Sequence, residues 1–351
     1  MREPAFWWRG GEAAAAAALL APAAALYGAI AAGRMALAGA RASVPVLCVG
    51  NFTLGGAGKT PAAIALARLL MAAGHRPFFL SRGYGGRLAG PILLGAGEAS
   101  HSARDVGDEP LLLAKIAPTV VARDRPAGAA MAASSGADLI IMDDGLQNPA
   151  IAKDFSIAVV DGRRGIGNGR VFPAGPLRAP LSAQLEHVDA LLVVGATTAL
   201  SDCAIEAARK RGLPVFHGEL RPDRAVAAAL AGKPVLAFAG IADPDKFFAT
   251  LEACAIPAAV RVRFPDHHRY TGAEMVALLA RADRERLVPF TTEKDLARME
   301  GDAAAAELLA RARALPVTLT FAEPDTMARA LREALQRAAS RRGASNRPAP
   351  G

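Results

Sequence analysis

Short apolar runs alternate with segments of helical periodicity along the first part of the chain. Residues 44–49 (VPVLCV) are typical of a strand buried in a parallel sheet, and residues 59–71 then carry apolar side chains at the spacing of a helix. Similar strand-like runs follow at residues 77–80, 119–121, 139–142, 157–160 and 191–194. Because strands and helices alternate in this way, we expect a doubly wound parallel-sheet domain of the α/β class.

A second alternating series begins near Pro214. Its strand-like runs lie at residues 235–239, 260–264, 288–291 and 317–321, with helical segments between them. The series predicts a second, smaller α/β domain over residues 219–339, following a larger domain over residues 41–218. Residues 340–351 are rich in Arg, Gly, Pro and Ser, and this composition predicts a disordered tail.

A glycine-rich polar segment, GNFTLGGAGKTP, separates the first predicted strand from the first predicted helix. Its glycines would let backbone N–H groups turn inward around polyphosphate oxygens, while Lys59 would reach the terminal phosphates and the Thr60 hydroxyl would bind Mg²⁺. The strict pattern GxxxxGK[ST] fails at one position, since its first glycine would fall at Thr53. The layout still predicts a P-loop that binds a nucleotide. The expected binding residues are Thr53, Leu54, Gly55, Gly56, Ala57, Gly58, Lys59 and Thr60.

The N-terminal segment, residues 1–40, contains an uncharged, alanine-rich run at 13–32 that Pro22 interrupts. A spanning helix is disfavoured because alanine contributes little insertion energy, and a cleaved signal peptide because a nucleotide-type loop follows almost at once. A buried core helix remains an alternative. We favour a helix in the membrane interface, with Trp7 and Trp8 at headgroup depth. Three arginines would face acidic lipid: Arg2, Arg9 and Arg34.

Composition limits the kind of core and the kind of partner. Hydrophobic residues make up 52% of the 351 residues and aromatic residues only 5%, so the core must consist largely of Ala, Leu and Val. Three scattered cysteines fit a reducing cytoplasm better than a disulfide framework or a metal site. The net charge of +8 favours anionic partners. Because no aromatic residues interleave with the basic runs, we expect no nucleic-acid partner.

An acidic motif ends the apolar run at residues 139–142. It contains Asp143 and Asp144, followed by Gln147 and Asn148. A carboxylate at a strand end beside a phosphate cradle is the usual means of holding Mg²⁺ on a nucleotide, directly or through water. An ordinary strand end with an Asp turn is the alternative interpretation. Given the P-loop upstream, we favour a metal site.

Two further motifs offer acid–base groups. Phosphoryl transfer to an alcohol needs a carboxylate that accepts the hydroxyl proton, and Asp108 or Glu109 in GDEP could do this, although either could simply cap a helix. Asp266, His267 and His268 follow a predicted strand. Two adjacent histidines without a nearby cysteine do not make a complete metal site, but a neutral histidine can orient a carboxylate or share its proton.

Eight motifs occur in order between Gly50 and Asp295, within a resemblance that runs from the region of Phe6 and Trp7 to about Asp295. They are GNFTLGGAGKTP, SRGYGGR, GDEP, MDDGLQN, GNGRVFPAGPLR, AFAGIADP, FPDHHRYT and TTEKD. This ordered set resembles the tetraacyldisaccharide 4'-kinase family, the inner-membrane lipid kinases of lipid A biosynthesis, whose members also carry Thr or Ser at the position of Thr53. The resemblance implies an ATP-dependent phosphotransferase with an alcohol acceptor. It would transfer the ATP γ-phosphate to the 4'-hydroxyl of a tetraacylated glucosamine disaccharide 1-phosphate.

The resemblance also assigns roles to residues. Lys59 and Thr60 match the nucleotide and Mg²⁺ positions, and Asp108 matches the proposed base. His267 matches a histidine that pairs with this base, with His268 as the alternative. The metal-proximal strand end corresponds to Asp143, Asp144 and Gln147. Since one catalytic partner comes from each domain, closure of the two domains over ATP is implied.

The implied location is the cytoplasmic face of the bacterial inner membrane, as a peripheral or monotopic protein with no obligate protein partner. The sequence departs from the family pattern at two positions, since Asn148 stands where the family usually has His, and Ala179 where it usually has Glu. A membrane-recruited P-loop ATPase switch is the alternative function. Such switches often carry a second lysine near the start of the loop, where this chain has Thr53 and Leu54.

Overall fold

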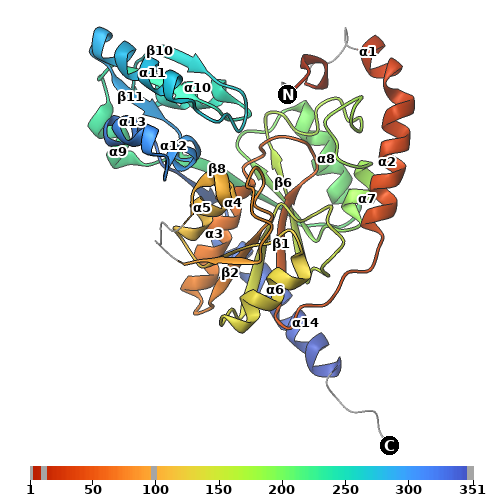
Figure 1. Cartoon of the computed structure of the whole chain (residues 1–351). Coiled ribbons are helices and arrows are strands. Elements are labelled where there is room, and N and C mark those ends of the chain that lie inside the picture. Colours follow the sequence, from red (N-terminus) through yellow and green to blue (C-terminus); the bar gives the residue numbers. More distant parts are fainter. Residues whose placement is uncertain (1–2, 9–13, 96–100, 346–351) are drawn as a thin grey trace, which may run out of the picture.

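The structure is a computed structural model that describes residues 3–8, 14–95 and 101–345. Its strands form two sheets, of nine and four strands (Figure 1). The order in the large sheet is β13-β8-β7-β6-β1-β5-β2-β4-β3, and among the described residues only the pairs β13–β8 and β3–β4 are antiparallel. The strands are β1 (Val46–Asn51), β2 (Pro77–Ser81), β3 (Ile92–Leu94), β4 (Thr119–Val121), β5 (Leu139–Asp143), β6 (Phe155–Asp161), β7 (Ala190–Val194), β8 (Val215–Pro222) and β13 (Val317–Phe321).

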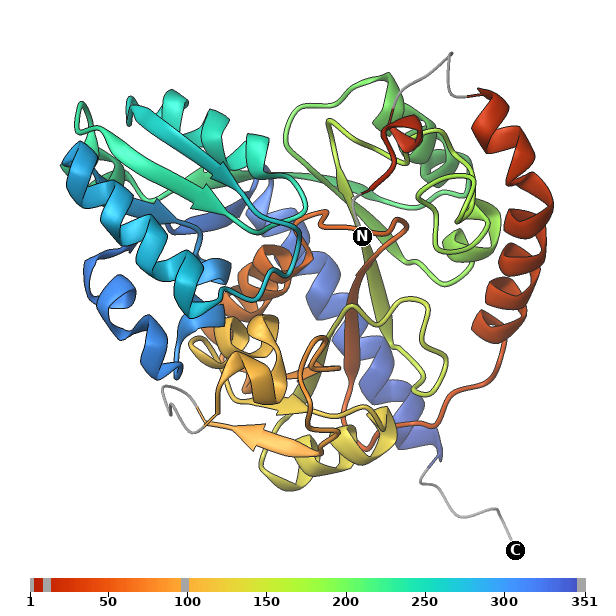
Figure 2. The same ribbon diagram turned by 45° about the horizontal axis from the view of Figure 1, so that its top comes forward.

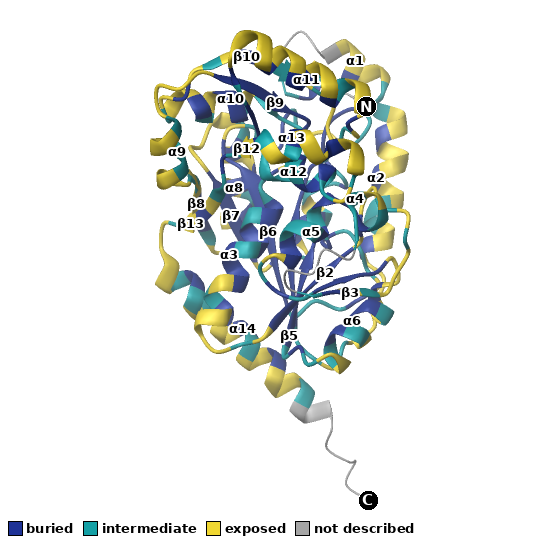
Figure 3. Ribbon diagram, turned by 60° about the vertical axis from the view of Figure 1, so that its left-hand side comes forward, coloured by how far each residue is buried: buried dark blue, intermediate teal, exposed yellow. Residues whose placement is uncertain are grey.

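Helices cover both faces of the large sheet. Successive residues of β1 point to opposite faces: Leu47 and Val49 pack with helices α3 and α14, whereas Val46 packs with α6 and Cys48 with α8. The central strands are therefore fully buried, as a parallel sheet requires (Figure 3). The helices of this domain are α3 (Lys59–Ala72), α4 (Ala103–Val106), α5 (Asp108–Ala114), α6 (Arg125–Ser134), α7 (Leu181–Leu185), α8 (Ala199–Lys210) and α14 (Pro324–Ser345).

The small sheet has the order β10-β9-β11-β12 and is parallel throughout its described pairings. Helix α10 packs on one of its faces, and α11 with α13 on the other. The chain enters and leaves this domain at one point of the large sheet, because the Asp223 N–H donates to the Pro316 carbonyl at 2.8 Å. Its elements are α9 (Arg224–Leu230), β9 (Val235–Ala239), α10 (Pro244–Ala253), β10 (Ala258–Arg263), α11 (Gly272–Glu285), β11 (Val288–Thr291), α12 (Glu293–Met299), η2 (Ala303–Ala305), α13 (Ala306–Arg311) and β12 (Arg313–Ala314).

The predicted α/β fold with a parallel sheet is confirmed, but three predicted boundaries are wrong. Strand β13 belongs to the large sheet, where it pairs with β8, and not to the smaller domain. Strand β8 runs through the predicted boundary at residue 219. Helix α14 continues through residue 345, so residues 340–345 are helical and not a disordered tail, in part because Arg342 pairs with Asp154 at 2.8 Å. Residues 346–351 lie outside the described part.

The N-terminal segment folds as η1 (Ala5–Trp7), α1 (Ala14–Leu19) and α2 (Ala21–Met35). Pro22 lies in the first turn of α2, where its missing N–H has no helical partner to lose. The placement of Trp7 at headgroup depth is wrong: Trp7 is buried, and its Nε1 donates to the Pro173 carbonyl at 3.1 Å. Arg2 and Arg9 lie outside the described residues. Within the described chain, no helix combines the length and the apolar character that crossing a bilayer demands.

Helices α1 and α2 lie on the flank of the molecule (Figure 1). They expose several apolar side chains. Leu19 is 83% exposed, Leu26 66%, Ile30 57% and Leu37, just after α2, 62%. The alternative prediction, a helix buried in the core, does not describe α2 as a whole. Only a few of its residues are buried, namely Ala24, Gly28 and Met35. One face of α2 thus rests on the protein while another presents apolar surface to its surroundings.

Candidate functional site

The glycine-rich loop connects the end of β1 to the start of α3. Gly55 and Gly58 have φ of 90° and 87°, in the left-handed region that glycine adopts without strain. The Glu3 carboxylate packs against Gly55 and would have to shift to admit a side chain there, and Figure 2 shows the N-terminal segment beside this loop. The loop ends at the N-terminus of a 14-residue helix, where free N–H groups and the helix dipole favour an anion.

The start of the loop, Thr53 and Leu54, is held by the segment before α7. The Leu54 N–H donates to the Pro176 carbonyl at 2.8 Å, and Arg178 Nε donates to the Thr53 carbonyl at 2.9 Å. Thr53 and Leu54 therefore contribute backbone groups to the shape of the cradle. Nothing in these contacts involves the Thr53 hydroxyl.

Lys59 and Thr60 are both buried at the first turn of α3. Lys59 Nζ donates to Asn51 Oδ1 at 3.2 Å and lies 3.7 Å from Asp144 Oδ1. The Thr60 hydroxyl donates to Asp143 Oδ2 at 3.4 Å. The structure thus brings together the predicted phosphate-binding ammonium and the predicted metal-binding hydroxyl with the acidic end of β5.

The two aspartates at the end of β5 differ in their surroundings. Asp143 is buried, and its Oδ1 has no hydrogen-bond partner among the described residues. Burial, together with the charges of Glu109 and Asp144, raises the pKa of Asp143 to about 7. Asp144 instead forms a two-pronged ion pair with Arg178, at 2.8 and 3.1 Å. Although burial opposes it, Lys59 and Arg178 lower the pKa of Asp144.

Gln147 uses its amide nitrogen for the protein, since Nε2 donates to the Asn51 carbonyl and to Gln184 Oε1, both at 2.7 Å. Its Oε1 accepts a hydrogen bond from Arg178 Nη1 at 3.4 Å, and the same guanidinium also holds both oxygens of Asp144. Thr60 and Asp143 are therefore the side chains best placed to hold Mg²⁺. The described residues contain no group of three or more His, Cys, Asp or Glu side chains arranged as a metal site. This is compatible with Mg²⁺, which is usually bound by one or two carboxylates together with water and substrate phosphates.

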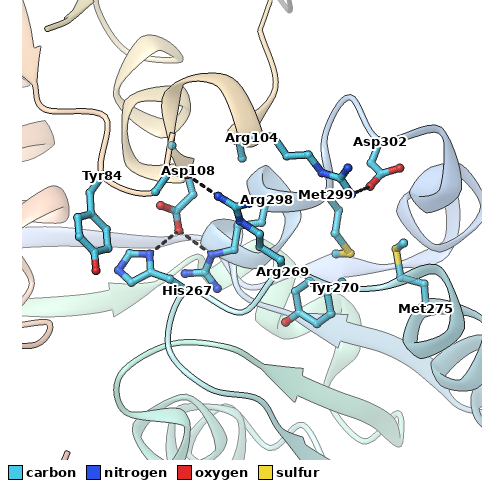
Figure 4. A pocket seen from close by; sticks show the side chains of 13 residues that line it. Tyr84, Arg104, Asp108, His267, Arg269, Tyr270, Met275, Arg298, Met299 and Asp302 are labelled. Atoms are coloured by element: carbon cyan, nitrogen blue, oxygen red, sulfur yellow. Dashed lines mark hydrogen bonds and ion pairs between the residues drawn. The ribbon is translucent and has the colours of Figure 1, made fainter. Parts of the chain in front are cut away.

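Asp108 begins α5 and lies in a pocket between the two domains (Figure 4). Arg298 Nε donates to Asp108 Oδ2 at 2.6 Å, and His267 Nδ1 lies 3.3 Å from the same oxygen. Burial would raise the pKa of Asp108, but the hydrogen bond with His267 and the charges of Arg298 and Lys294 lower it overall. In return, the hydrogen bond with Asp108 raises the pKa of His267 despite partial burial.

The geometry separates the alternatives that the sequence left open. His268 points to Glu274, with Nε2 3.0 Å from its carboxylate, and stacks on Phe264, so His267 is the histidine that faces Asp108. Glu109 forms an ion pair with Lys294 at 2.8 Å. Burial would raise the pKa of Glu109, but Lys294 and Lys59 lower it overall.

The two departures from the family pattern have simple surroundings. Asn148 Oδ1 accepts a hydrogen bond from the Ala150 N–H at 2.8 Å, which stabilises a turn. Ala179 is fully buried, and its carbonyl accepts from Gln184 Nε2 at 2.7 Å. Neither contact involves the nucleotide loop directly.

Sequence reasoning missed several residues of the site. Arg298 and Lys294 reach Asp108 and Glu109 from α12, and both lie on one face of that helix because they are four residues apart. Arg178 holds Asp144. Lys294 lies in the TTEKD motif and Arg178 in GPLR, so the sequence could have drawn attention to both residues. It could not show which carboxylates they contact. For Arg298 the only signal was its spacing from Lys294.

Known proteins resemble this chain over nearly its whole length. Residues 16–336 match the family model of tetraacyldisaccharide-1-P 4'-kinase. The chain is 56% identical over 325 residues to the tetraacyldisaccharide 4'-kinase of Methylobacterium nodulans, covering 93% of each chain. It is 52% identical over 347 residues to that of Rhodopseudomonas palustris strain BisA53, covering 99% of this chain and 100% of the other. Among solved structures it resembles LpxK from Aquifex aeolicus in complex with ATP, with a TM-score of 0.70, 25% identity and coverage of 91% and 99%.

Proposed function

Because the chain belongs to the tetraacyldisaccharide-1-P 4'-kinase family, and is thus a kinase of lipid A biosynthesis, we propose how its residues carry out the transfer. The donor is ATP, as in the related structure, and the acceptor is the tetraacyldisaccharide 1-phosphate. The alternative of an ATPase switch is set aside on the family membership.

We assign the ATP phosphates to the loop of residues 53–60. Its left-handed glycines and the N-terminus of α3 suit a polyphosphate, and Lys59 would stabilise charge on the transferring phosphoryl group. Thr60 and Asp143 would hold Mg²⁺. Asp143 Oδ1 is an oxygen without a hydrogen-bond partner among the described residues, at the end of β5, and its other oxygen accepts from the Thr60 hydroxyl. Bound Mg²⁺ would neutralise phosphate charge.

We assign the acceptor side to Asp108. It would accept the hydrogen bond of the attacking hydroxyl and receive its proton as the new bond forms. Because the pKa of Asp108 is lowered by His267, Arg298 and Lys294, this carboxylate stays ionised and ready at neutral pH. A weak base is adequate here, since the transition state of phosphoryl transfer is loose and bond formation to the nucleophile is slight when it is reached. His267 would orient Asp108 or share the proton.

The observation that supports this assignment is the buried Asp108 carboxylate between His267 and Arg298 in a pocket. Asp108→Asn keeps size and hydrogen bonding but removes the proton acceptor. We expect ATP affinity close to wild type and phosphoryl transfer reduced by roughly 10²- to 10⁴-fold. Asp302→Asn is a matched control, because Asp302 lines the same pocket but pairs with Arg104.

Nucleotide binding and acceptor phosphorylation should be measured on the same preparations, with His267→Ala and the double variant beside them. If Asp108 and His267 act as one unit, the double variant should be little worse than Asp108→Asn alone. Full transfer by Asp108→Asn would remove this residue from the mechanism. Loss of ATP binding would move it to the nucleotide side.

We also propose that α1 and α2 dock on the cytoplasmic face of the inner membrane. The acceptor carries acyl chains, and the exposed Leu19, Leu26, Ile30 and Leu37 offer an apolar surface for the bilayer interface. Arg34, in the last turn of α2, is exposed and can approach acidic lipid. A surface helix of this kind would place the catalytic domains next to membrane-held acceptor.

Closure of the smaller domain over ATP remains a prediction. It is supported by the position of Asp108 and its two partners, which come from different domains and would be separated if the domains moved apart. Scattering profiles with and without a nonhydrolysable ATP analogue would contradict closure if they were superimposable.

A further inference from the structure

Arg298 is a charged side chain with 6% exposure on α12, and it lines the pocket that contains Asp108 and His267 (Figure 4). A guanidinium is rarely buried to this extent unless its N–H groups are paired. The partners of its three nitrogens therefore indicate what the side chain does.

Two of these nitrogens are fully engaged with the protein. Nε donates to Asp108 Oδ2 at 2.6 Å, which links the smaller domain to the larger one. Nη1 donates to Asp295 Oδ1 at 2.8 Å and to the Gly240 carbonyl. The guanidinium is thus held at both ends of its planar fork.

The third nitrogen, Nη2, is buried and has no hydrogen-bond partner among the described residues. Leaving a buried donor unpaired is unfavourable, and more so for a charged group. Such a group in a reaction pocket, beside the carboxylate assigned as base, suits an oxygen of the substrate.

The anchor of Arg298 is itself rigid. Asp295 is fully buried and accepts hydrogen bonds from the Tyr270 hydroxyl at 2.8 Å and from the Thr292 hydroxyl at 2.6 Å. The Gly240 N–H also donates to it, at 3.1 Å. Because Asp295 cannot move freely, Nη2 is fixed in direction before any substrate arrives, which is the arrangement expected of a preorganised contact.

We propose that Arg298 contacts the acceptor directly, with Nη2 donating a hydrogen bond to the 4'-oxygen while Nε fixes the Asp108 oxygen. This inference rests on the proposed role of Asp108. The alcohol then donates its hydrogen to Asp108 and accepts one from Arg298, so that both its position and its orientation are set. We favour the acceptor over ATP because the residues lining the pocket with Arg298 include none from the loop 53–60.

The test pairs a change in the protein with a change in the acceptor. Binding of the parent tetraacyldisaccharide 1-phosphate and of its 4'-deoxy analogue should be measured for wild type and Arg298→Lys, in detergent, with ATP affinity measured in parallel. A lysine retains the charge but has one nitrogen and cannot serve Asp108, Asp295 and the acceptor together.

We expect Arg298→Lys to bind the parent acceptor about 10- to 100-fold more weakly, the loss typical of one hydrogen bond to a charged group. Its affinity for the deoxy analogue and for ATP should stay close to wild type. Arg104→Lys is the matched control, since Arg104 lines the same pocket but pairs with Asp302, and both acceptor affinities should be retained. Equal losses for parent and deoxy acceptor in Arg298→Lys, or a loss confined to ATP, would overturn the proposal.

A second measurement covers the case in which Arg298→Lys does not fold. In Asp108→Asn, Arg298 is intact, so the parent acceptor should still bind more tightly than the deoxy analogue. Equal affinity in that variant would overturn the contact with Arg298. Failure of the proposed role of Asp108 would look different, because Asp108→Asn would then phosphorylate the parent acceptor at the wild-type rate.

Discussion

The apolar face of α1 and α2 allows a quantitative prediction about membrane binding. Leu26 and Ile30 are 66% and 57% exposed and lie four residues apart, on one side of α2. Fully burying such a side chain stabilises by roughly 1.5–3 kcal/mol, so the exposed part of each is worth about 1–2 kcal/mol on transfer to the bilayer interface. Replacing both by glutamine should therefore weaken vesicle binding by about 2–4 kcal/mol, or roughly 30- to 1,000-fold.

The assay is flotation with vesicles that contain acidic phospholipid, using the full chain. Val276→Gln is the matched control, because Val276 is 65% exposed on α11 of the smaller domain. The Tm of the Leu26→Gln, Ile30→Gln double variant should stay close to wild type, since both side chains are already accessible to solvent. The docking proposal fails if the double variant floats like wild type, or if Val276→Gln loses as much binding.

Three other expectations concern the phosphate loop, His267 and the core. Lys59→Ala and Thr60→Ala should each abolish most transfer while the protein stays folded, because we propose that Lys59 stabilises charge on the transferring phosphate and that Thr60 holds Mg²⁺; wild-type turnover in either would refute the loop assignment. The hydrogen bond with Asp108 raises the pKa of His267 in the folded protein. The ion pair of His267 with Asp108 therefore contributes fully to stability below about pH 6.5, and this contribution is lost as the pH rises through the raised pKa of the folded state. His267→Gln should thus lower the free energy of unfolding in urea at pH 5.5 more than at pH 9, and equal losses would count against the pairing. Leu331→Ala should cost about 2–5 kcal/mol in the same urea assay, because Leu331 is 2% exposed in the core that the large sheet shares with α3 and α14; a loss under about 1 kcal/mol would show that α14 is not packed there.

Most of the strands were predictable because each is a local apolar run, but sheet membership was not. The predicted runs omit β3, β8 and β12, since β3 and β12 are only three and two residues long and β8 mixes polar with apolar residues. In residues 317–321 (VTLTF) the two threonines are exposed and the residues that flank them are more buried, as in many edge strands. Nothing in five such residues specifies whether they pair with β8 or with a strand of the smaller domain. In the structure they pair with β8, where Val317 lies opposite Pro222, a residue far away in the sequence.

In the candidate site, too, the local features could be predicted from the sequence and the contacts between distant residues could not. The loop of residues 53–60 is contiguous, so its chemistry can be inferred from a short window of sequence. The contact between Asp108 and Arg298 joins residues 190 positions apart, and no local pattern signals it. For Trp7 the local pattern led to a wrong prediction. An aromatic residue beside an apolar run is found both at membrane interfaces and in protein pockets, and only the contact with Pro173 shows that Trp7 lies in a pocket.

The position of the smaller domain, inserted between β8 and β13, has a consequence for synthesis on the ribosome. The larger domain needs β13 to cover the edge of β8, and it needs Met327 and Leu331 of α14 to complete the apolar core on one face of the sheet. These residues emerge after the whole smaller domain, so the nascent chain carries an open sheet edge and an uncovered apolar face until translation is nearly finished. A chain terminated before residue 317 would keep the entire nucleotide loop, yet we expect it to aggregate instead of accumulating as a partial kinase.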